Sequence, residues 1–99
     1  MTIYEVNLFV DTAIADEYAE WLKGHVDEML EIDGFQEATW YAVENDNDAE
    51  EHWCIHYRLD NREALEAYFN GPAERMRGDG LRHFRGRFTA ERRVLQVVS

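Results

Sequence analysis

The chain has 99 residues, 45% of them hydrophobic and 13% aromatic, and its formal net charge at pH 7 is −11. This length fits a single domain over residues 1–99, and the many large apolar side chains argue against a disordered chain. The acidic charge argues against nucleic-acid binding, which depends largely on Lys and Arg neutralising phosphates. No apolar run approaches the roughly 20 residues of a membrane-spanning helix. Neither nucleic acid nor a membrane is therefore expected as a partner.

The cysteine content and the first residues bear on the compartment. Cys54 is the only cysteine and cannot form an intramolecular disulfide, which suits a reducing environment. Residues 1–5 show no basic segment followed by an apolar one, so no secretory signal is recognised. We therefore expect a cytoplasmic protein.

Along the first half of the chain, the apolar pattern switches between the periods of a strand and of a helix. Residues 2–10 alternate, which predicts a strand. An apolar stripe at steps of three and four over residues 14–30 predicts an amphipathic helix of about five turns. Residues 35–44 and 52–60 are predicted to be strands joined by the polar hairpin loop 45–51.

The second half repeats the order of helix and strand. Asp60-Asn61 is expected to cap a second helix, which Asn70-Gly71-Pro72 should kink or break because proline cannot donate to the helical ladder. Residues 87–98 are predicted to be the last strand. The predicted fold class is therefore α+β. It is a ferredoxin-like β-α-β-β-α-β order, with a four-stranded antiparallel sheet and both helices on one face.

The strand over residues 52–60 carries the main functional hypothesis. Its odd positions are large and apolar, whereas its even positions include two histidines, a cysteine and an arginine. The helices can cover only one face of the sheet, so the even positions should look out from the open face. That face is more apolar than a solvated one needs to be. A second copy packed against it would give a dimeric α+β barrel, so a homodimer is expected.

A small-ligand pocket is predicted on this open face, because apolar walls and a few placed polar groups are what such pockets use. Trp40 joins the set if the hairpin pairs Val43 with Trp53 and Tyr41 with Ile55. His56 is the candidate catalytic residue, since the imidazole pKa lies nearest neutrality. His25, on the apolar stripe of the first helix, is a second candidate for the cavity wall. The full predicted ligand-binding set is Glu5, Asn7, Trp40, Cys54, His56, Arg58 and His25.

Simpler explanations exist for several of these residues. Glu5 and Arg58 could form an ion pair, with His56 bonded within a dimer seam, and Cys54 is better explained as a half-buried interface cysteine than as a nucleophile. His52 and His83, near element ends, are expected to be solvated. His52, Cys54 and His56 share one strand face, but their α-carbons span nearly 14 Å at about 3.4 Å per residue, too wide for one ion. No metal and no cofactor are expected, since no phosphate loop or dinucleotide fingerprint is present.

The basic residues are distributed unevenly. Residues 1–74 hold three of the ten basic residues and 19 of the 21 acidic ones, whereas residues 75–99 hold seven arginines against two acidic residues. These arginines either pair with acidic surface in the same molecule or a partner subunit, or form a local site for an anionic small molecule.

Five stretches of the chain carry a resemblance to known proteins: residues 3–7 (IYEVN), 20–25 (EWLKGH), 57–60 (YRLD), 66–68 (EAY) and 87–95 (RFTAERRVL). Across nearly its whole length, the chain resembles a family of small bacterial proteins that carries a domain-of-unknown-function label. In topology it is similar to the dimeric α+β barrel superfamily, which includes antibiotic-biosynthesis monooxygenases, haem-degrading enzymes and small decyclase-like proteins. The resemblance implies the fold but no activity or catalytic residue.

Three functions are compatible with these features of the sequence. The first is a homodimer that binds a small organic ligand, aromatic or anionic, in a cavity at the open sheet face. The second is a cofactor-less monooxygenase or isomerase that uses the same cavity. The third is a structural or interaction dimer with no ligand.

Overall fold

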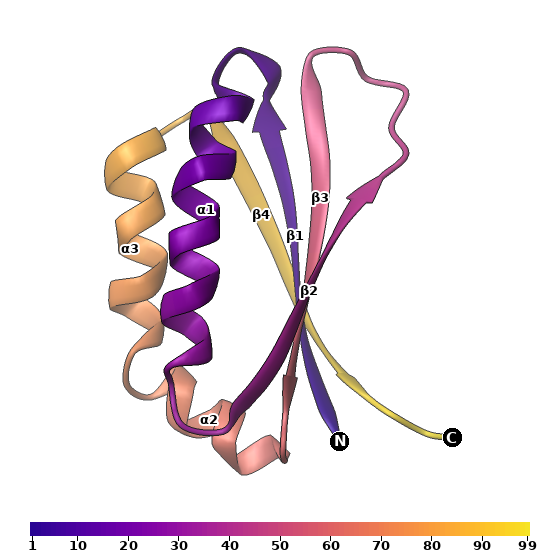
Figure 1. Ribbon diagram of the computed structural model, residues 1–99, viewed down its shortest axis with the longest axis vertical. Helices are drawn as coiled ribbons and strands as arrows, with labels where there is room; N and C mark the ends of the chain where they lie inside the picture. The colour runs from indigo at the N-terminus through magenta and orange to yellow at the C-terminus, as the bar shows by residue number, and fades with distance from the viewer.

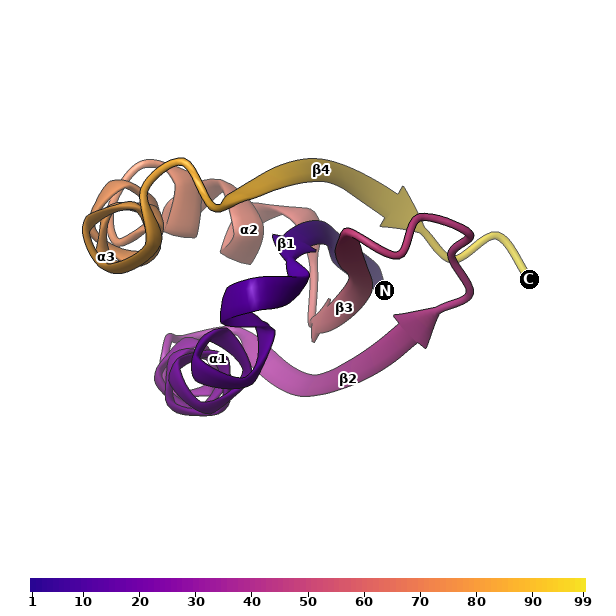
Figure 2. The same ribbon diagram turned by 90° about the horizontal axis from the view of Figure 1, so that it is seen from above.

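A computed structural model describes residues 1–99 and shows a layer of helices packed on one sheet (Figure 1). The strands are antiparallel in the order β2-β3-β1-β4, so β1 and β3 are central. Figure 2, seen from above, also places α1 and α3 together on one side of the sheet. In chain order the elements are β1 (Thr2–Asp11), a 3-10 turn (Thr12–Ile14), α1 (Ala15–Leu30), β2 (Phe35–Val43), β3 (Glu50–Leu59), α2 (Arg62–Phe69), α3 (Ala73–Phe84) and β4 (Phe88–Gln96).

The predicted ferredoxin-like β-α-β-β-α-β fold is confirmed. The expected interruption at Asn70-Gly71-Pro72 divides the second helical segment into α2 and α3. No helix has both the length and the apolar character needed to cross a bilayer.

The core lies between the helices and the face of the sheet that they cover. Alternate residues of β1 and β3 point into it, as the sequence pattern predicts. Tyr4 is the centre of an aromatic group, with ring centroids 6.1 Å from Tyr57, 5.8 Å from Tyr68 and 5.5 Å from Phe69. The largest side chains that are almost fully buried are Tyr4, Tyr18, Leu22, Met29, Ile55, Tyr57, Leu59, Leu65 and Met76.

Short polar contacts set the ends of the elements. Asp11 Oδ1 accepts a hydrogen bond from the Ala13 amide at 2.8 Å, and Asn61 Oδ1 accepts one from the Ala64 amide at 2.9 Å, which caps α2. Gly34 turns the chain from α1 into β2 with φ +91°, and a Cβ there would lie 2.5 Å from Ala64 Cβ. A side chain at position 34 is therefore excluded by both conformation and space.

The register of β2 differs from the one that placed Trp40 on the open face. Tyr41 lies opposite Cys54 and Trp40 lies opposite Ile55, so Trp40 faces the helices. The reason is an irregularity between Phe35 and Glu37 that adds one residue to β2 and exchanges its two faces beyond that point. The Trp40 indole then packs edge-on against Trp53, with ring centroids 5.2 Å apart. The prediction that Trp40 lines the open face is therefore wrong.

Candidate functional site

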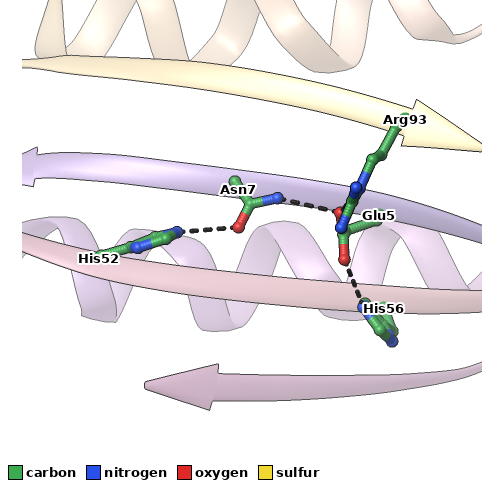
Figure 3. Close-up of polar contacts among 5 residues, drawn as sticks. All are labelled: Glu5, Asn7, His52, His56 and Arg93. Carbon is green, nitrogen blue, oxygen red and sulfur yellow. Dashed lines mark hydrogen bonds and ion pairs between the residues drawn. The ribbon is translucent and has the colours of Figure 1, made fainter. Parts of the chain in front are cut away.

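The open face of the sheet gathers five hydrogen-bonded side chains, which we call the open-face cluster: Glu5, Asn7, His52, His56 and Arg93 (Figure 3). They come from three neighbouring strands, β1, β3 and β4. Glu5 lies opposite His56 in one ladder of β1 and opposite Arg93 in the other. Strand register alone therefore builds the cluster, with no contribution from a loop.

Glu5 is the centre of the cluster, and its side chain is only 6% exposed. His56 Nε2 donates to Oε1 at 2.9 Å, Asn7 Nδ2 donates to Oε2 at 3.2 Å, and Arg93 Nε also donates to Oε2. The Arg93 hydrogen bond is the main cause that lowers the pKa of Glu5 to about 2, against the opposing effect of burial. Glu5 is therefore a fully partnered carboxylate at neutral pH.

The hydrogen bond from Asn7 to Glu5 fixes the orientation of the Asn7 amide, and through it the contact with His52. Because the Asn7 amide nitrogen donates to Glu5, the amide oxygen faces His52 and accepts from its Nε2 at 2.8 Å. The His52 ring also stacks on Phe9, with centroids 4.3 Å apart. His52, expected to be solvated, is thus half-buried and bonded.

His56, the predicted catalytic residue, donates its Nε2 proton to Glu5, which leaves Nδ1 as the nitrogen that could accept a proton. Its side chain is 30% exposed, and Tyr41 lies edge-on against it at 5.3 Å. A catalytic role for His56 stays a prediction.

Cys54 lies between the two histidines of β3 and is buried. Burial is the main cause that raises the pKa of its thiol to about 11, and the nearby Glu5 charge adds to it. One ligand atom each from Glu5, Cys54 and His56 lies within 4.8 Å of the others, close enough for a shared cation. A cation would have to displace Arg93 from Glu5 and remove the thiol proton, so the arrangement favours an ion-pair network over a metal centre.

Arg58 is not part of the open-face cluster. Arg58 pairs with Glu37 at 3.0 Å across β2 and β3, and both side chains are over 40% exposed. The suggested Glu5–Arg58 pair is therefore wrong, because Arg93 takes that place. Arg93 was absent from the predicted set, although the apolar alternation of Phe88 and Ala90 along β4 could have assigned it to the open face.

The opposite side of the sheet holds a cavity of about 390 Å³ between the sheet and helices α1 and α3, which we call the helix-side cavity. Its walls are mostly apolar and include the rings of Tyr18, Trp21, Tyr57 and Phe88. Gly80 of α3 lies so close to α1 that a Cβ there would sit 3.0 Å from Trp21 Cη2. The volume and the apolar lining are typical of small-molecule sites, which span roughly 300–1,000 Å³.

Three basic side chains border the helix-side cavity: His25, Arg77 and Arg92. Arg77 Nη2 donates to Tyr4 Oη at 3.1 Å. Burial is the main cause that lowers the pKa of His25; the Glu28 carboxylate opposes it, and the positive charge of Arg92 adds a smaller lowering, so the neutral imidazole is favoured at pH 7. The His25 ring stacks on Trp21 with centroids 4.7 Å apart. His25 is the one predicted ligand residue that lies at this cavity.

Comparisons with known proteins support the fold and leave the activity open. The family model of DUF4286, a domain of unknown function, matches residues 1–98. No curated protein matches the chain.

Solved structures share the fold at low sequence identity. SnoaB, a cofactor-independent oxygenase from Streptomyces nogalater, is 16% identical with a TM-score of 0.72, over 99% of this chain and 94% of SnoaB. A variant of MhuD, solved with two manganese protoporphyrin IX molecules per active site, is 18% identical with a TM-score of 0.69, over 98% of this chain and 95% of MhuD. An antibiotic biosynthesis monooxygenase is 14% identical with a TM-score of 0.67, over the full length of both chains. At these identities the likeness establishes the fold alone.

Proposed function

Because the chain belongs to the DUF4286 family, a domain of unknown function, we propose a function from its own geometry: it binds a small organic molecule in the helix-side cavity. The observation that carries the proposal is the cavity of about 390 Å³, with aromatic walls and a few basic groups at its border. Apolar walls with a small number of placed polar groups are the usual features of a small-molecule site. The MhuD neighbour, which holds a porphyrin, supports this use of the fold.

This proposal moves the ligand from the open face, where the sequence placed it, to the other face of the sheet. A hollow of about 310 Å³ does exist beside Asn7 and His52, but Phe9 is its single apolar lining residue. Asn7, His52 and Arg93 are already hydrogen-bonded within the open-face cluster, and the remaining polar lining residues, Glu91 and Arg92, carry opposite charges. The helix-side cavity combines more apolar surface with two arginines, Arg77 and Arg92, that form no ion pair.

An uncharged fluorescent probe, phenylnaphthylamine, tests whether the helix-side cavity binds ligands. We expect saturable binding of one probe per chain. Ala90 lines the cavity from β4, so Ala90→Phe should fill part of it and weaken binding by about tenfold or more. Ala67→Phe, on an exposed position of α2, is the matched control and should leave the affinity unchanged. Equal binding to all three proteins, or none to the wild type, would contradict the proposal.

We further propose that the open face packs against a second copy of the chain. Tyr41 and Val43 are exposed on this face, at 48% and 37%, and the partly buried Phe9 and Ile3 lie on the same face of β1. Glu5 is already paired with Arg93 and hydrogen-bonded to His56, so its burial in an interface leaves no unpaired carboxylate. A patch with apolar residues around a satisfied polar centre suits a symmetric interface.

Native mass spectrometry of the purified protein tests the dimer and retained ligand together. We expect twice the chain mass, and additional mass on each subunit would begin to identify the ligand. Tyr41→Asp should shift the protein to monomers, because it places a charge in the proposed dimer interface. A monomeric wild type would contradict the dimer, and a dimer that binds no probe would favour a purely structural dimer.

His25 favours a second candidate function, a cofactor-less monooxygenase or isomerase that uses the same cavity. Its imidazole is kept neutral, and neither ring nitrogen is used in a protein side-chain hydrogen bond, so it could accept a proton from a bound substrate. SnoaB, with the same fold, is described as a cofactor-independent oxygenase. Oxygen consumption with a panel of phenols tests the idea: turnover should occur with the wild type and be lost in His25→Gln, with probe binding retained.

A further inference from the structure

The ion pairs of this chain leave an unexpected set of cations without partners. Six of the ten Lys and Arg residues pair with a carboxylate within 4.0 Å: Lys23, Arg58, Arg62, Arg82, Arg87 and Arg93. Four do not: Arg75, Arg77, Arg85 and Arg92. In a chain with 21 acidic residues, a partner could readily have been supplied to each.

Two of the four arginines without a carboxylate, Arg77 and Arg92, border the helix-side cavity. Arg92 is the more unusual, because it stands on the face of β4 that Phe88, Ala90 and Val94 otherwise make apolar. Its side chain is exposed, borders both this cavity and the hollow beside His52, and forms no ion pair within the chain. Its positive charge acts on the cavity wall, since it adds to burial in lowering the pKa of His25, against the larger opposing effect of the Glu28 carboxylate.

Both arginines border the cavity near Tyr68, since the positive charge of each opposes the rise that burial causes in the pKa of the Tyr68 hydroxyl. Arg77, from α3, donates to the hydroxyl of Tyr4 at 3.1 Å. Arg92, from β4, lies opposite Val6. Val6 and Tyr4 are two residues apart along β1, so their α-carbons are separated by about 7 Å. Two guanidinium groups at one end and aromatic rings along the walls make an amphipathic site. Such a site matches a ligand with an acidic group at one end of an apolar body.

We propose that the helix-side cavity takes an organic anion: an apolar, ring-sized body buried among the aromatic walls, with one acidic group bound by Arg77 and Arg92. This inference rests on the proposed function and adds the chemical class of the ligand. It also gives a use to two of the four arginines that have no carboxylate partner, Arg77 and Arg92.

A pair of probes that differ only by a charge tests the inference. Anilinonaphthalenesulfonate has the same rings as phenylnaphthylamine and adds a sulfonate. We expect the wild type to bind the anionic probe at least fivefold more tightly than the neutral one. Arg77→Gln and Arg92→Gln should each weaken the anionic probe by about tenfold, the value of one hydrogen bond to a charged group, and leave the neutral probe unchanged.

Control variants separate a local effect from a general one. Arg75→Gln and Arg85→Gln remove unpaired arginines that do not line the cavity, so both should bind the anionic probe as the wild type does. Arg77→Lys keeps the charge but loses the planar fork, and should bind with intermediate affinity. Circular dichroism confirms that each variant is folded.

The outcomes distinguish the two proposals. If neither probe binds, or if Ala90→Phe has no effect, the cavity is not a ligand site and the proposed function fails. If the neutral probe binds in the cavity but the sulfonate gives no advantage, only the inference about an anion is overturned. Equal losses in Arg77→Gln and Arg85→Gln would also overturn it, because the effect would then be net charge.

Discussion

The two faces of the sheet differ in whether their polar side chains have charged or hydrogen-bonded partners within the protein. On the open face, Glu5 accepts hydrogen bonds from Asn7, His56 and Arg93, and each partner is fixed by strand register. On the helix side, Arg92 forms no ion pair, and Arg77 contacts the Tyr4 hydroxyl and the Phe69 ring but no carboxylate, although both arginines border a cavity.

The contrast separates a structural cluster from a candidate binding site. A buried polar group that already has its partners stabilises the fold but offers little to a ligand. A polar group at a cavity that lacks partners is free to bind one. This contrast supports our proposals that the open-face cluster stabilises the sheet and a dimer interface, and that the helix-side cavity binds a ligand.

The largest effect on stability is expected when the centre of the open-face cluster is removed. Glu5→Ala removes the acceptor that Asn7, His56 and Arg93 share, and should lower the free energy of unfolding by about 2 kcal/mol. Urea unfolding at one fixed protein concentration measures this, since a dimer's stability depends on concentration. Probe affinity at the helix-side cavity should stay unchanged. A loss below about 1 kcal/mol would show that the cluster is not the structural centre we describe.

Lowering the pH should remove the stabilisation that the Glu5 carboxylate provides. The pKa of Glu5 is about 2 in the folded protein and near 4.5 when unfolded, so the unfolded state takes up its proton first as the pH falls. The stabilisation is therefore complete above about pH 5 and is lost as the pH falls from there towards 2. The free energy of unfolding of the wild type and of Glu5→Gln, measured at each pH, tests this. The difference between the two free energies should shrink as the pH falls from about 5 to about 2. A constant difference would contradict the pairing.

Cys54 should react slowly while the protein is folded. A thiol whose pKa is raised to about 11 holds about a hundredfold less thiolate near neutral pH than one at its reference value of 9.0. Reaction with a disulfide reagent should therefore be at least that much slower in the native protein than in urea. A fast native reaction would instead support the nucleophile that the sequence left open.

The smallest effect is expected at the exposed ion pair beside the cluster. Arg58→Gln breaks the pair with Glu37, which is largely in solvent, and should change the unfolding free energy by no more than about 0.5 kcal/mol. It should change neither probe binding nor the dimer. A loss of probe binding here would support the original prediction that Arg58 contacts the ligand.

The sequence predicted the fold well because its apolar periods are clear. The alternation along β1 and β3 identified the central strands and brought Glu5, Asn7, Cys54 and His56 to one face. Trp40 was misplaced because one extra residue near Gln36 exchanges the faces of β2, and local composition does not reveal such an irregularity.

The site was harder to predict than the fold. Arg93 was missed because the faces of the last strand were left unassigned, although its alternation holds that information. The helix-side cavity could not be foreseen, because it depends on how closely α3 approaches α1 at Gly80, a matter of three-dimensional packing. His25 was identified only as a residue that could line a cavity.

The most direct test of which face binds a ligand is amide chemical-shift mapping of the isotope-labelled protein titrated with anilinonaphthalenesulfonate. If the helix-side cavity is the site, the largest shifts will fall on the amides of His25, Gly80 and Ala90, and those of His52 and His56 will move little. If the largest shifts fall instead on His52 and His56, the open face is the binding site, and our assignment of the two faces is wrong.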